Sequence, residues 1–324
     1  MRTITVEEHF TTPSFLAGPG RQFKEQSLRS GSRGAKLFEQ LGDVGEKRVA
    51  DMDAAGIDMQ VLSLNYPGTE QCEAAEAIAV ARDANDLLAV AVKRHPARFA
   101  GLTALPTAAP DQAAEELERG VRRLGFKGAI INGHHRGRYL DDKFFWPIFE
   151  RADALKMPIY LHPTRPPQTV IDASYGGFAP EVSWAFSGPG WGWHIETAVH
   201  LIRLILGGVF DRFPDLQVVI GHLGEGLPFM LPRLDRNMPP ALTKLQRSLA
   251  DYLRQNVHYT FGGFNFPATF LDLLLEVGVG RIMFSVDYPY GSMTAARAFL
   301  EQLPVGAADK ERIAHGNAEK LFGL

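Results

Sequence analysis

An α/β fold, specifically a (β/α)8 barrel, is predicted by three features of the 324-residue sequence: eight short apolar runs, helical patterns between them, and a uniform composition. The runs are mostly apolar on consecutive residues, which is typical of strands that are buried on both faces in a parallel sheet. An open doubly wound sheet is the alternative. The runs span residues 3–6, 59–64, 100–105, 128–131, 158–161, 217–220, 257–261 and 281–285.

Helical patterns fill the gaps between these runs. Residues 111–124, for example, begin with an acidic residue and end with Arg122 and Arg123, which complements the helix dipole. We predict helices at residues 74–94, 111–124, 143–155, 195–206, 266–277 and 307–314, and a short helix that ends on the surface within the final GNAEKLFGL.

Two segments are too long to be simple connections: residues 12–46, after the first strand, and residues 163–193, after the fifth. We expect both to be long loops with a functional role. Both leave the carboxyl ends of strands, where a barrel has its active site. Because no composition break divides residues 1–324, a single domain is expected.

Composition excludes several classes of partner. The net charge is −3 and basic residues form no cluster, so neither nucleic acid nor an anionic membrane is an expected partner. The longest apolar stretch, residues 201–210, is far shorter than the ~20 residues that span a bilayer. Cys72 is the only cysteine, which excludes an internal disulfide and favours a cytoplasmic location.

Ligand-type side chains follow three of the predicted strands. Glu7 and His9 come at the end of the first, His162 after the fifth and Asp287 after the eighth, so a barrel places all four at one rim. Glu7 and His9 share a face of an extended chain, with Glu8 turned away. Two imidazoles and two carboxylates suit zinc, manganese or iron(II). The sequence therefore predicts one divalent metal ion.

His222 follows the sixth strand in the sequence GHLGEGLP, with Glu225 three residues later. If a helix begins near Gly224, Glu225 lies in its first turn and can accept a hydrogen bond from the imidazole. A histidine oriented by a carboxylate can carry a proton or stabilise charge. Three other histidines on rim loops, His134, His135 and His194, are either structural or in contact with substrate.

These motifs together resemble the amidohydrolase superfamily, in the branch of the γ-resorcylate, 2,3-dihydroxybenzoate and aminocarboxymuconate semialdehyde decarboxylases. The resemblance covers nearly the whole chain and rests on VEEHF, RHPARFAGLTALP, GAIING, MPIYLHP, FDRFPDLQVVIGHLGEGLPF, RIMFSVDYP and GNAEKLFGL, in family order. It implies that the four ligand-type residues bind the metal and that His222 and Glu225 lie beside the substrate. It also implies substrate contacts from Arg233 and Asn132, and a homodimer or homotetramer.

The Glu7-Glu8-His9 sequence is similar to that of hydroxybenzoate decarboxylases rather than to the His-x-His pair usual in the superfamily. The position where binuclear members carry a bridging lysine reads Ile131-Asn132-Gly133, which favours a single ion, Zn²⁺ or Mn²⁺. Aromatic residues offer the walls of a flat pocket, unless they only pack the long loop onto the barrel. These are Phe186, Trp191, Trp193 and Tyr288.

The resulting prediction is a non-oxidative decarboxylase of a hydroxylated aromatic acid. Asp287 protonates the ring carbon of the chelated substrate, His222 and Glu225 assist, and Arg233 donates to anionic oxygen. No organic cofactor is expected, because no dinucleotide-binding fingerprint is present. The alternatives are a hydrolase or hydratase that uses a metal-bound water on an ester, amide, lactone or unsaturated acid, and a non-catalytic barrel. Which aromatic acid is the substrate stays open.

Overall fold

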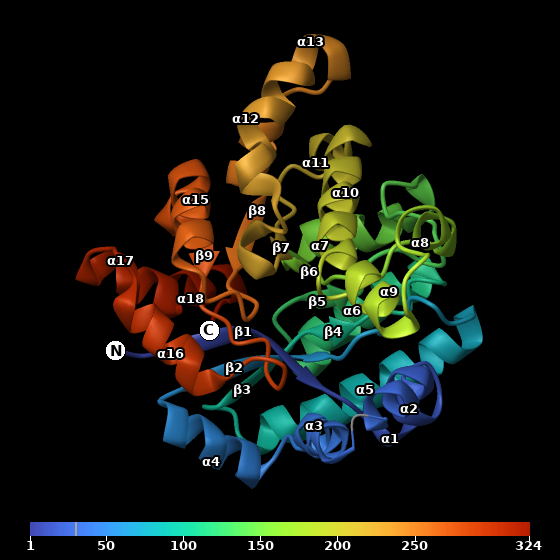
Figure 1. The fold of residues 1–324 in the computed structure, drawn as a ribbon, viewed down its shortest axis with the longest axis vertical. Helices are drawn as coiled ribbons and strands as arrows, with labels where there is room; N and C mark the ends of the chain where they lie inside the picture. The colour runs from blue at the N-terminus through green and yellow to red at the C-terminus, as the bar shows by residue number, and fades with distance from the viewer. Residues whose placement is uncertain (30) are drawn as a thin grey trace.

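Nine short parallel strands lie at the centre of the computed structural model, which describes residues 1–29 and 31–324 (Figure 1). They form two ladders, one in the order β1-β2-β3 and one from β4 through to β9 in sequence order. The strands are β1 (Ile4–Phe10), β2 (Met59–Leu64), β3 (Phe99–Gly101), β4 (Thr103–Ala104), β5 (Ala129–Ile131), β6 (Ile159–Leu161), β7 (Val218–Ile220), β8 (Val257–Thr260) and β9 (Ile282–Met283).

Backbone hydrogen bonds connect the two ladders into a barrel. β3 and β4 are the two halves of the strand predicted at 100–105, and between them Leu102 N donates to Leu62 O at 2.9 Å. Val6 N donates to Phe284 O at 3.1 Å, which joins β1 to the chain directly after β9. The eight predicted strand positions are therefore present in the predicted order, and the barrel is confirmed.

The barrel interior has its own core, separate from the larger core between strands and helices. The last helix, α18 (Asn317–Phe322), adds Phe322, which is 2% exposed, to this interior core. The predicted short helix is present and is followed by the exposed Gly323, while the side chain of Phe322 points into the barrel interior. The core consists of Ile4, Val6, Met59, Val61, Ala100, Leu102, Ile130, Tyr160, Val219, Met283, Ala318 and Phe322.

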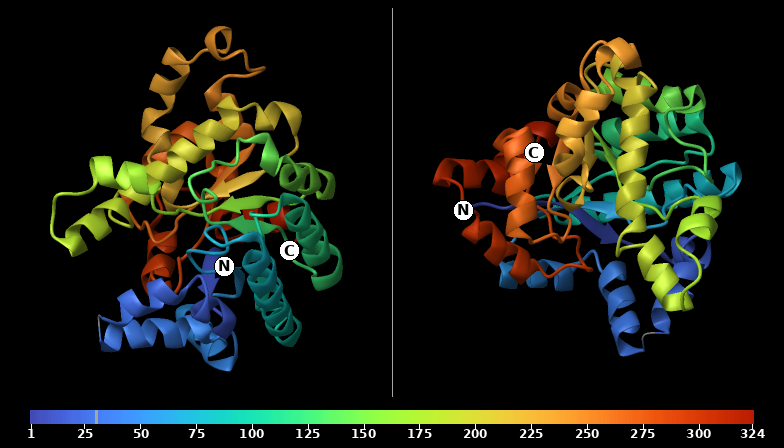
Figure 2. Two further views of the ribbon diagram at one scale, coloured as in Figure 1. Left: turned by 90° about the vertical axis from the view of Figure 1, so that its right-hand side faces the viewer. Right: turned by 45° about the horizontal axis from the view of Figure 1, so that its top comes forward.

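Helices surround the strands, as both views in Figure 2 show. In α5 (Ala74–Arg94) the buried residues Ala77, Ala81, Ala84, Leu88 and Ala91 recur every three or four positions, which gives one apolar stripe against the barrel. The remaining predicted helices are present with shifted ends. They are α6 (Pro110–Leu124), η1 (Lys143–Phe145) with α7 (Trp146–Leu155), α10 (Gly192–Leu206), α15 (Pro267–Val277), and α17 (Ala307–Glu311) with η4 (Arg312–Gly316).

The two long segments are helical rather than plain loops, which corrects the prediction; Ser30 lies outside the described residues. Their helices are too short to give a clear period in the sequence. The first segment holds α1 (Pro13–Ala17), α2 (Arg21–Leu28) and α3 (Ser32–Gly42), and the second holds α8 (Gln168–Ser174) and α9 (Pro180–Ser187).

Several further elements were not predicted. α12 and α13 extend beyond the rest of the molecule at the top of Figure 1. No helix among the described residues is both long and apolar enough to cross a membrane. The further elements are α4 (Glu46–Ala55), α11 (Val209–Arg212), η2 (His222–Gly224), α12 (Leu227–Asn237), α13 (Pro240–Thr243), α14 (Leu249–Gln255), η3 (Val279–Arg281) and α16 (Met293–Gln302).

Because Phe322 fills the barrel interior, Phe322→Ala is expected to lower the free energy of unfolding by about 3–5 kcal/mol. Leu275→Ala is the matched control, since Leu275 is 84% exposed, and it is expected to change stability by less than about 0.5 kcal/mol. Urea unfolding measures both. Equal stability of the two variants would contradict the assignment of Phe322 to the core.

Candidate metal centre

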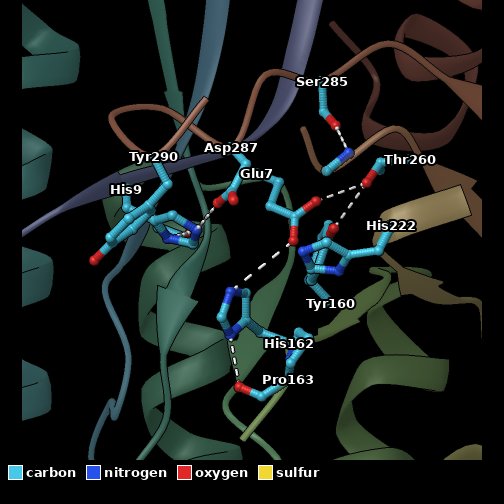
Figure 3. A network of polar contacts seen from close by, with 12 residues as sticks. Glu7, His9, Tyr160, His162, Pro163, His222, Thr260, Ser285, Asp287 and Tyr290 are labelled. Carbon is cyan, nitrogen blue, oxygen red and sulfur yellow. Dashed lines mark hydrogen bonds and ion pairs between the residues drawn. The ribbon is translucent and has the colours of Figure 1, made fainter. Parts of the chain in front are cut away.

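The structure brings four ligand-type side chains together at one rim of the barrel (Figure 3). Glu7, His9, His162 and Asp287 each offer one ligand atom, and these atoms all lie within 4.8 Å of one another. His9 Nε2 is 3.1 Å from Asp287 Oδ1, and His162 Nε2 is 3.9 Å from Glu7 Oε1. Glu7 and His9 lie in β1, His162 directly follows β6, and Asp287 follows β9, so the barrel brings together residues that are far apart in sequence.

A β-bulge directs Glu7 into the cluster. The register of β1 against β2 shifts between Val6 and Glu8, and Glu7 has a φ of 99°. The strand is thus not the plain extended segment that was expected, and the bulge re-aims its side chain. Thr260 Oγ1 donates to Glu7 Oε2 at 2.8 Å. A Cβ at Gly221 would lie 2.6 Å from Glu7 Oε1, so glycine is needed for this close approach.

Both imidazoles present a free nitrogen to the cluster. His162 Nδ1 lies 2.9 Å from Pro163 O, which makes Nδ1–H the donor and leaves the Nε2 lone pair available. His9 Nδ1 lies 3.4 Å from Ser63 Oγ. Burial lowers the pKa of His9 to about 3 and that of His162 well below its usual value, and neighbouring positive charges add to the shift. Both side chains are therefore neutral, as metal ligands must be.

The two carboxylates lack sufficient positive charge from the protein. Glu7 Oε1 is buried without a hydrogen-bond partner among the described residues. Burial raises the pKa of both Glu7 and Asp287 to about 7, despite the charge of His222 nearby. An unpaired buried carboxylate oxygen beside two neutral imidazoles fits a bound divalent cation.

Glu8, which faces away from the cluster, holds the segment that carries Asp287. Its Oε1 accepts from Val286 N at 2.9 Å and its Oε2 from Tyr288 N at 3.2 Å. One carboxylate thus binds the residues on both sides of Asp287, which has a φ of 63°. Burial raises the pKa of Glu8 to about 8, although the two backbone donors and Arg48 oppose this shift.

Arg48 completes this support and was not identified from the sequence. It is fully buried, and its Nη1 donates to His9 O at 2.8 Å while its Nε donates to Gln60 Oε1 at 2.7 Å. Gln60 Nε2 in turn lies 3.4 Å from Glu8 Oε2, and the guanidinium lies 4.6 Å from the Tyr288 ring centroid. We call this group of Glu8, Arg48 and Gln60 the brace. Two consecutive acidic residues in a buried strand were the only signal for it.

A second polar group lies next to the cluster. His222 Nδ1 is 2.7 Å from Glu225 Oε1, and His194 Nδ1 is 2.6 Å from Glu225 Oε2. Burial disfavours charge on both partners, yet Glu225 and Glu7 raise the pKa of His222 to about 10, and the two histidines hold the pKa of Glu225 down at about 2. His222 and Glu225 therefore form a buried ion pair.

The backbone around this pair differs from the prediction. η2 spans His222–Gly224, Glu225 is left-handed with a φ of 56°, and α12 begins only at Leu227. Glu225 thus precedes the helix rather than lying in its first turn. The predicted contact with the imidazole is nevertheless present, because a run of left-handed residues turns both side chains toward each other.

The residues predicted to contact substrate lie in different environments, some exposed and some buried. Phe186 packs on Tyr175 with ring centroids 4.8 Å apart, Trp191 is 52% exposed, and Arg233 is exposed on α12. Tyr288 is buried under Arg48. Phe186, Trp191 and Arg233 have no described contact with the ligand cluster, whereas Tyr288 O accepts from His9 N at 2.8 Å. Their contact with substrate, and the aromatic walls, stay predictions.

Tyr290 and Asn132 lie at the rim of the barrel that carries the ligand cluster. Tyr290 lies with its ring 5.9 Å from that of His9 and donates to Asn65 Oδ1 at 2.8 Å. It also lines a cleft of about 1420 Å³ between α2, α3, α4, α9 and residues 288–294. Asn132 is buried after β5, and its backbone N donates to Glu70 Oε1 at 2.9 Å. Tyr290 lies in the turn three residues after Asp287, and no period in the sequence indicated its place.

Comparison with known proteins agrees with this geometry. γ-Resorcylate decarboxylase of Polaromonas sp. is 39% identical over 333 residues, which cover 99% of this chain and 98% of that protein. The dihydroxybenzoic acid decarboxylase of Polaromonas sp., solved with manganese and the inhibitor 2-nitroresorcinol, has a TM-score of 0.89 at 36% identity and covers 100% of this chain and 97% of its own.

The 5-carboxyvanillate decarboxylase of Novosphingobium aromaticivorans, complexed with manganese and 4-hydroxy-3-methoxy-5-nitrobenzoic acid, has a TM-score of 0.91 at 34% identity. The match covers 100% of this chain and 96% of that one. A family model described as Amidohydrolase matches residues 9–324. With the family model, whole-length relatives and the barrel in agreement, this chain belongs to the amidohydrolase family.

Proposed function

We propose that this protein is a metal-dependent decarboxylase that removes CO2 from a hydroxylated aromatic acid without an oxidant or an organic cofactor. The observation that carries the proposal is the Glu7, His9, His162 and Asp287 cluster beside the His222–Glu225 ion pair. Whole-length similarity to hydroxybenzoate and carboxyvanillate decarboxylases supports it. Both structural neighbours hold a nitrophenol, in which a nitro group stands where an ortho-hydroxy acid has its carboxylate.

The four clustered residues are the proposed ligands of one divalent ion. Manganese is preferred over zinc, because the neighbouring decarboxylases contain manganese. When bound, the ion supplies Lewis acidity and a template for the adjacent phenolic and carboxylate oxygens of the substrate. A buried Glu7 oxygen without a donor and two neutral imidazoles support this assignment.

Asp287 is the proposed proton donor. Its side chain is 18% exposed, whereas those of Glu7, His9 and His162 are 0%, 1% and 6% exposed, so Asp287 faces the open side of the cluster. Its carboxyl proton moves to the ring carbon that bears the carboxylate. The bond from that carbon to the carboxylate then breaks, CO2 leaves, and the electron pair restores the aromatic ring. Water returns one proton to Asp287 in each turnover.

His222 contributes a fixed positive charge. Its imidazole lies beside Glu7 (Figure 3), and Glu225 holds its Nδ1–H. A preorganised cation in a buried site stabilises negative charge on substrate oxygens without reorganisation. Among the predicted substrate contacts, burial at the rim supports Asn132, and Tyr290 is added by its position against His9. Arg233, Phe186, Trp191 and Tyr288 stay predictions.

A homo-oligomer and a cytoplasmic location are further parts of the proposal. The projecting α12 and α13 expose Phe229 at 77% and Leu242 at 64%, which supports a contact surface between subunits. Cys72 is a free buried thiol, which is consistent with a reducing compartment.

The direct experiment is incubation of the manganese-loaded protein with 2,6-dihydroxybenzoate, 2,3-dihydroxybenzoate and 5-carboxyvanillate in deuterated water. We expect CO2 release, with deuterium at the carbon that lost the carboxylate, because the transferred proton comes from solvent through Asp287. Mass spectrometry and NMR of the product measure both. If no phenolic acid reacts while an ester or lactone panel is hydrolysed, the hydrolase alternative is correct instead.

Asp287→Asn is expected to keep most of the bound metal but to lower kcat by at least ~10²-fold, since the amide retains an oxygen ligand and has no acidic proton. Metal analysis and steady-state kinetics check the two parts separately. Near wild-type turnover in this variant would exclude Asp287 as the proton donor.

Glu8→Gln is expected to weaken manganese binding by about 10- to 100-fold, because one of the two backbone contacts that flank Asp287 loses its acceptor. Isothermal titration of the metal-free protein with Mn²⁺ measures the change. Glu319→Gln, which alters a surface ion pair with Arg2, is the control and should bind Mn²⁺ normally. Equal affinity in all three proteins would show that the brace does not support the metal site.

A further inference from the structure

His194 lies in the first turn of α10, where the segment of residues 163–193 ends. We propose that His194 is a positioning residue for the His222–Glu225 pair, and that this segment serves to bring His194 to Glu225. The inference rests on the proposed function, because it assigns a role within the same site. It gives a function to a part of the chain whose role the sequence left open.

Glu225 holds two imidazoles, one on each oxygen. Its side chain is 0% exposed, with His222 Nδ1 2.7 Å from Oε1 and His194 Nδ1 2.6 Å from Oε2. A buried carboxylate oxygen without a donor is unfavourable, so removal of His194 favours rotation of Glu225 toward another donor. His222 then loses the fixed acceptor that determines its ring orientation.

His194 is itself fixed by the segment that precedes it. Trp193 Nε1 lies 3.1 Å from His194 Nε2, so this nitrogen faces the segment while Nδ1 faces Glu225. Pro189 O is also 3.1 Å from His194 Nε2. The His194 ring lies edge-on to that of His222, with centroids 4.6 Å apart, and Phe264 lies 5.2 Å from both rings. The side chain is only 12% exposed.

The segment contributes little to the hydrophobic core by other means. Ile171 in α8 and Tyr175 directly after it are buried, but neither belongs to the two core clusters, and the buried residue of α9 is Ser187. Phe178 and Val182 are 59% and 53% exposed. The hydrogen bond of His194 to Glu225 is therefore the most specific connection between the segment and the site. This connection leads to the His222–Glu225 ion pair rather than to the metal ligands.

The test compares His194→Leu with His194→Asn in the manganese-loaded protein. Leucine removes the donor, so kcat is expected to fall about 10- to 100-fold with KM changed less than about 2-fold. Asparagine places its amide N–H near the position of Nδ1, and is expected to keep kcat within about 3-fold of wild type. Metal content should be unchanged in both. Val182→Ala in α9 is the control for general disturbance of the segment.

Retained turnover in His194→Leu overturns the proposal, and so does an asparagine variant as impaired as the leucine variant. A fall in kcat that is proportional to a loss of bound metal, or that also occurs in Val182→Ala, overturns the proposal as well. The effect would then come from folding rather than from positioning.

A measurement that needs no activity separates this inference from the proposed function. In protein labelled with ¹⁵N-histidine, wild type is expected to show two strongly downfield Nδ1–H resonances, from His194 and His222. His194→Leu should lose one and shift the other, whereas His194→Asn should lose one and leave the other in place. An unshifted His222 resonance in the leucine variant contradicts the positioning role even if the wild-type protein decarboxylates no tested acid.

Discussion

The candidate site depends on one buried interaction, the contact of the Glu8 carboxylate with the backbone on both sides of Asp287. It joins the end of β1 to the chain after β9, so it closes the barrel at the rim where the cluster lies. Arg48 offsets the buried charge and holds the carbonyl of His9 from the same side. Two ligand-bearing segments are thus fixed by one acidic and one basic residue that never face the metal position.

This fixation is needed because the site uses strained backbone. Glu7, His222, Glu225 and Asp287 all have positive φ, between 52° and 99°, although none is a glycine. Such residues cost of order 1–3 kcal/mol each and persist only where the surroundings determine them strongly. Here the strain turns side chains from separate strands into one small volume, and the brace together with the two histidines on Glu225 maintains it.

The sequence was sufficient for the barrel and for the composition of the cluster, because parallel strands have a recognisable apolar pattern and their carboxyl ends meet at one rim. The sequence was insufficient where tertiary contacts determine the backbone conformation or the position of a side chain. The bulge at Glu7 and the left-handed turn at Glu225 have no local signature, Arg48 is distant from the motifs, and the aromatic residues of 163–193 could not be positioned without the helices that carry them. The sequence placed His194 on a rim loop, but its contact with Glu225 and the position of Tyr290 against His9 became visible only in the structure.

We propose that one divalent ion at Glu7, His9, His162 and Asp287 holds the substrate through adjacent oxygens. The most direct test is titration of the metal-free and manganese-loaded protein, and of His162→Ala, with 2-nitroresorcinol, followed by the visible absorbance of the nitrophenol. Saturable binding of one molecule per chain is expected with Mn²⁺, and none measurable without the ion or in His162→Ala, which should bind no metal. Equal binding with and without Mn²⁺, or unchanged metal-dependent binding in His162→Ala, would contradict it.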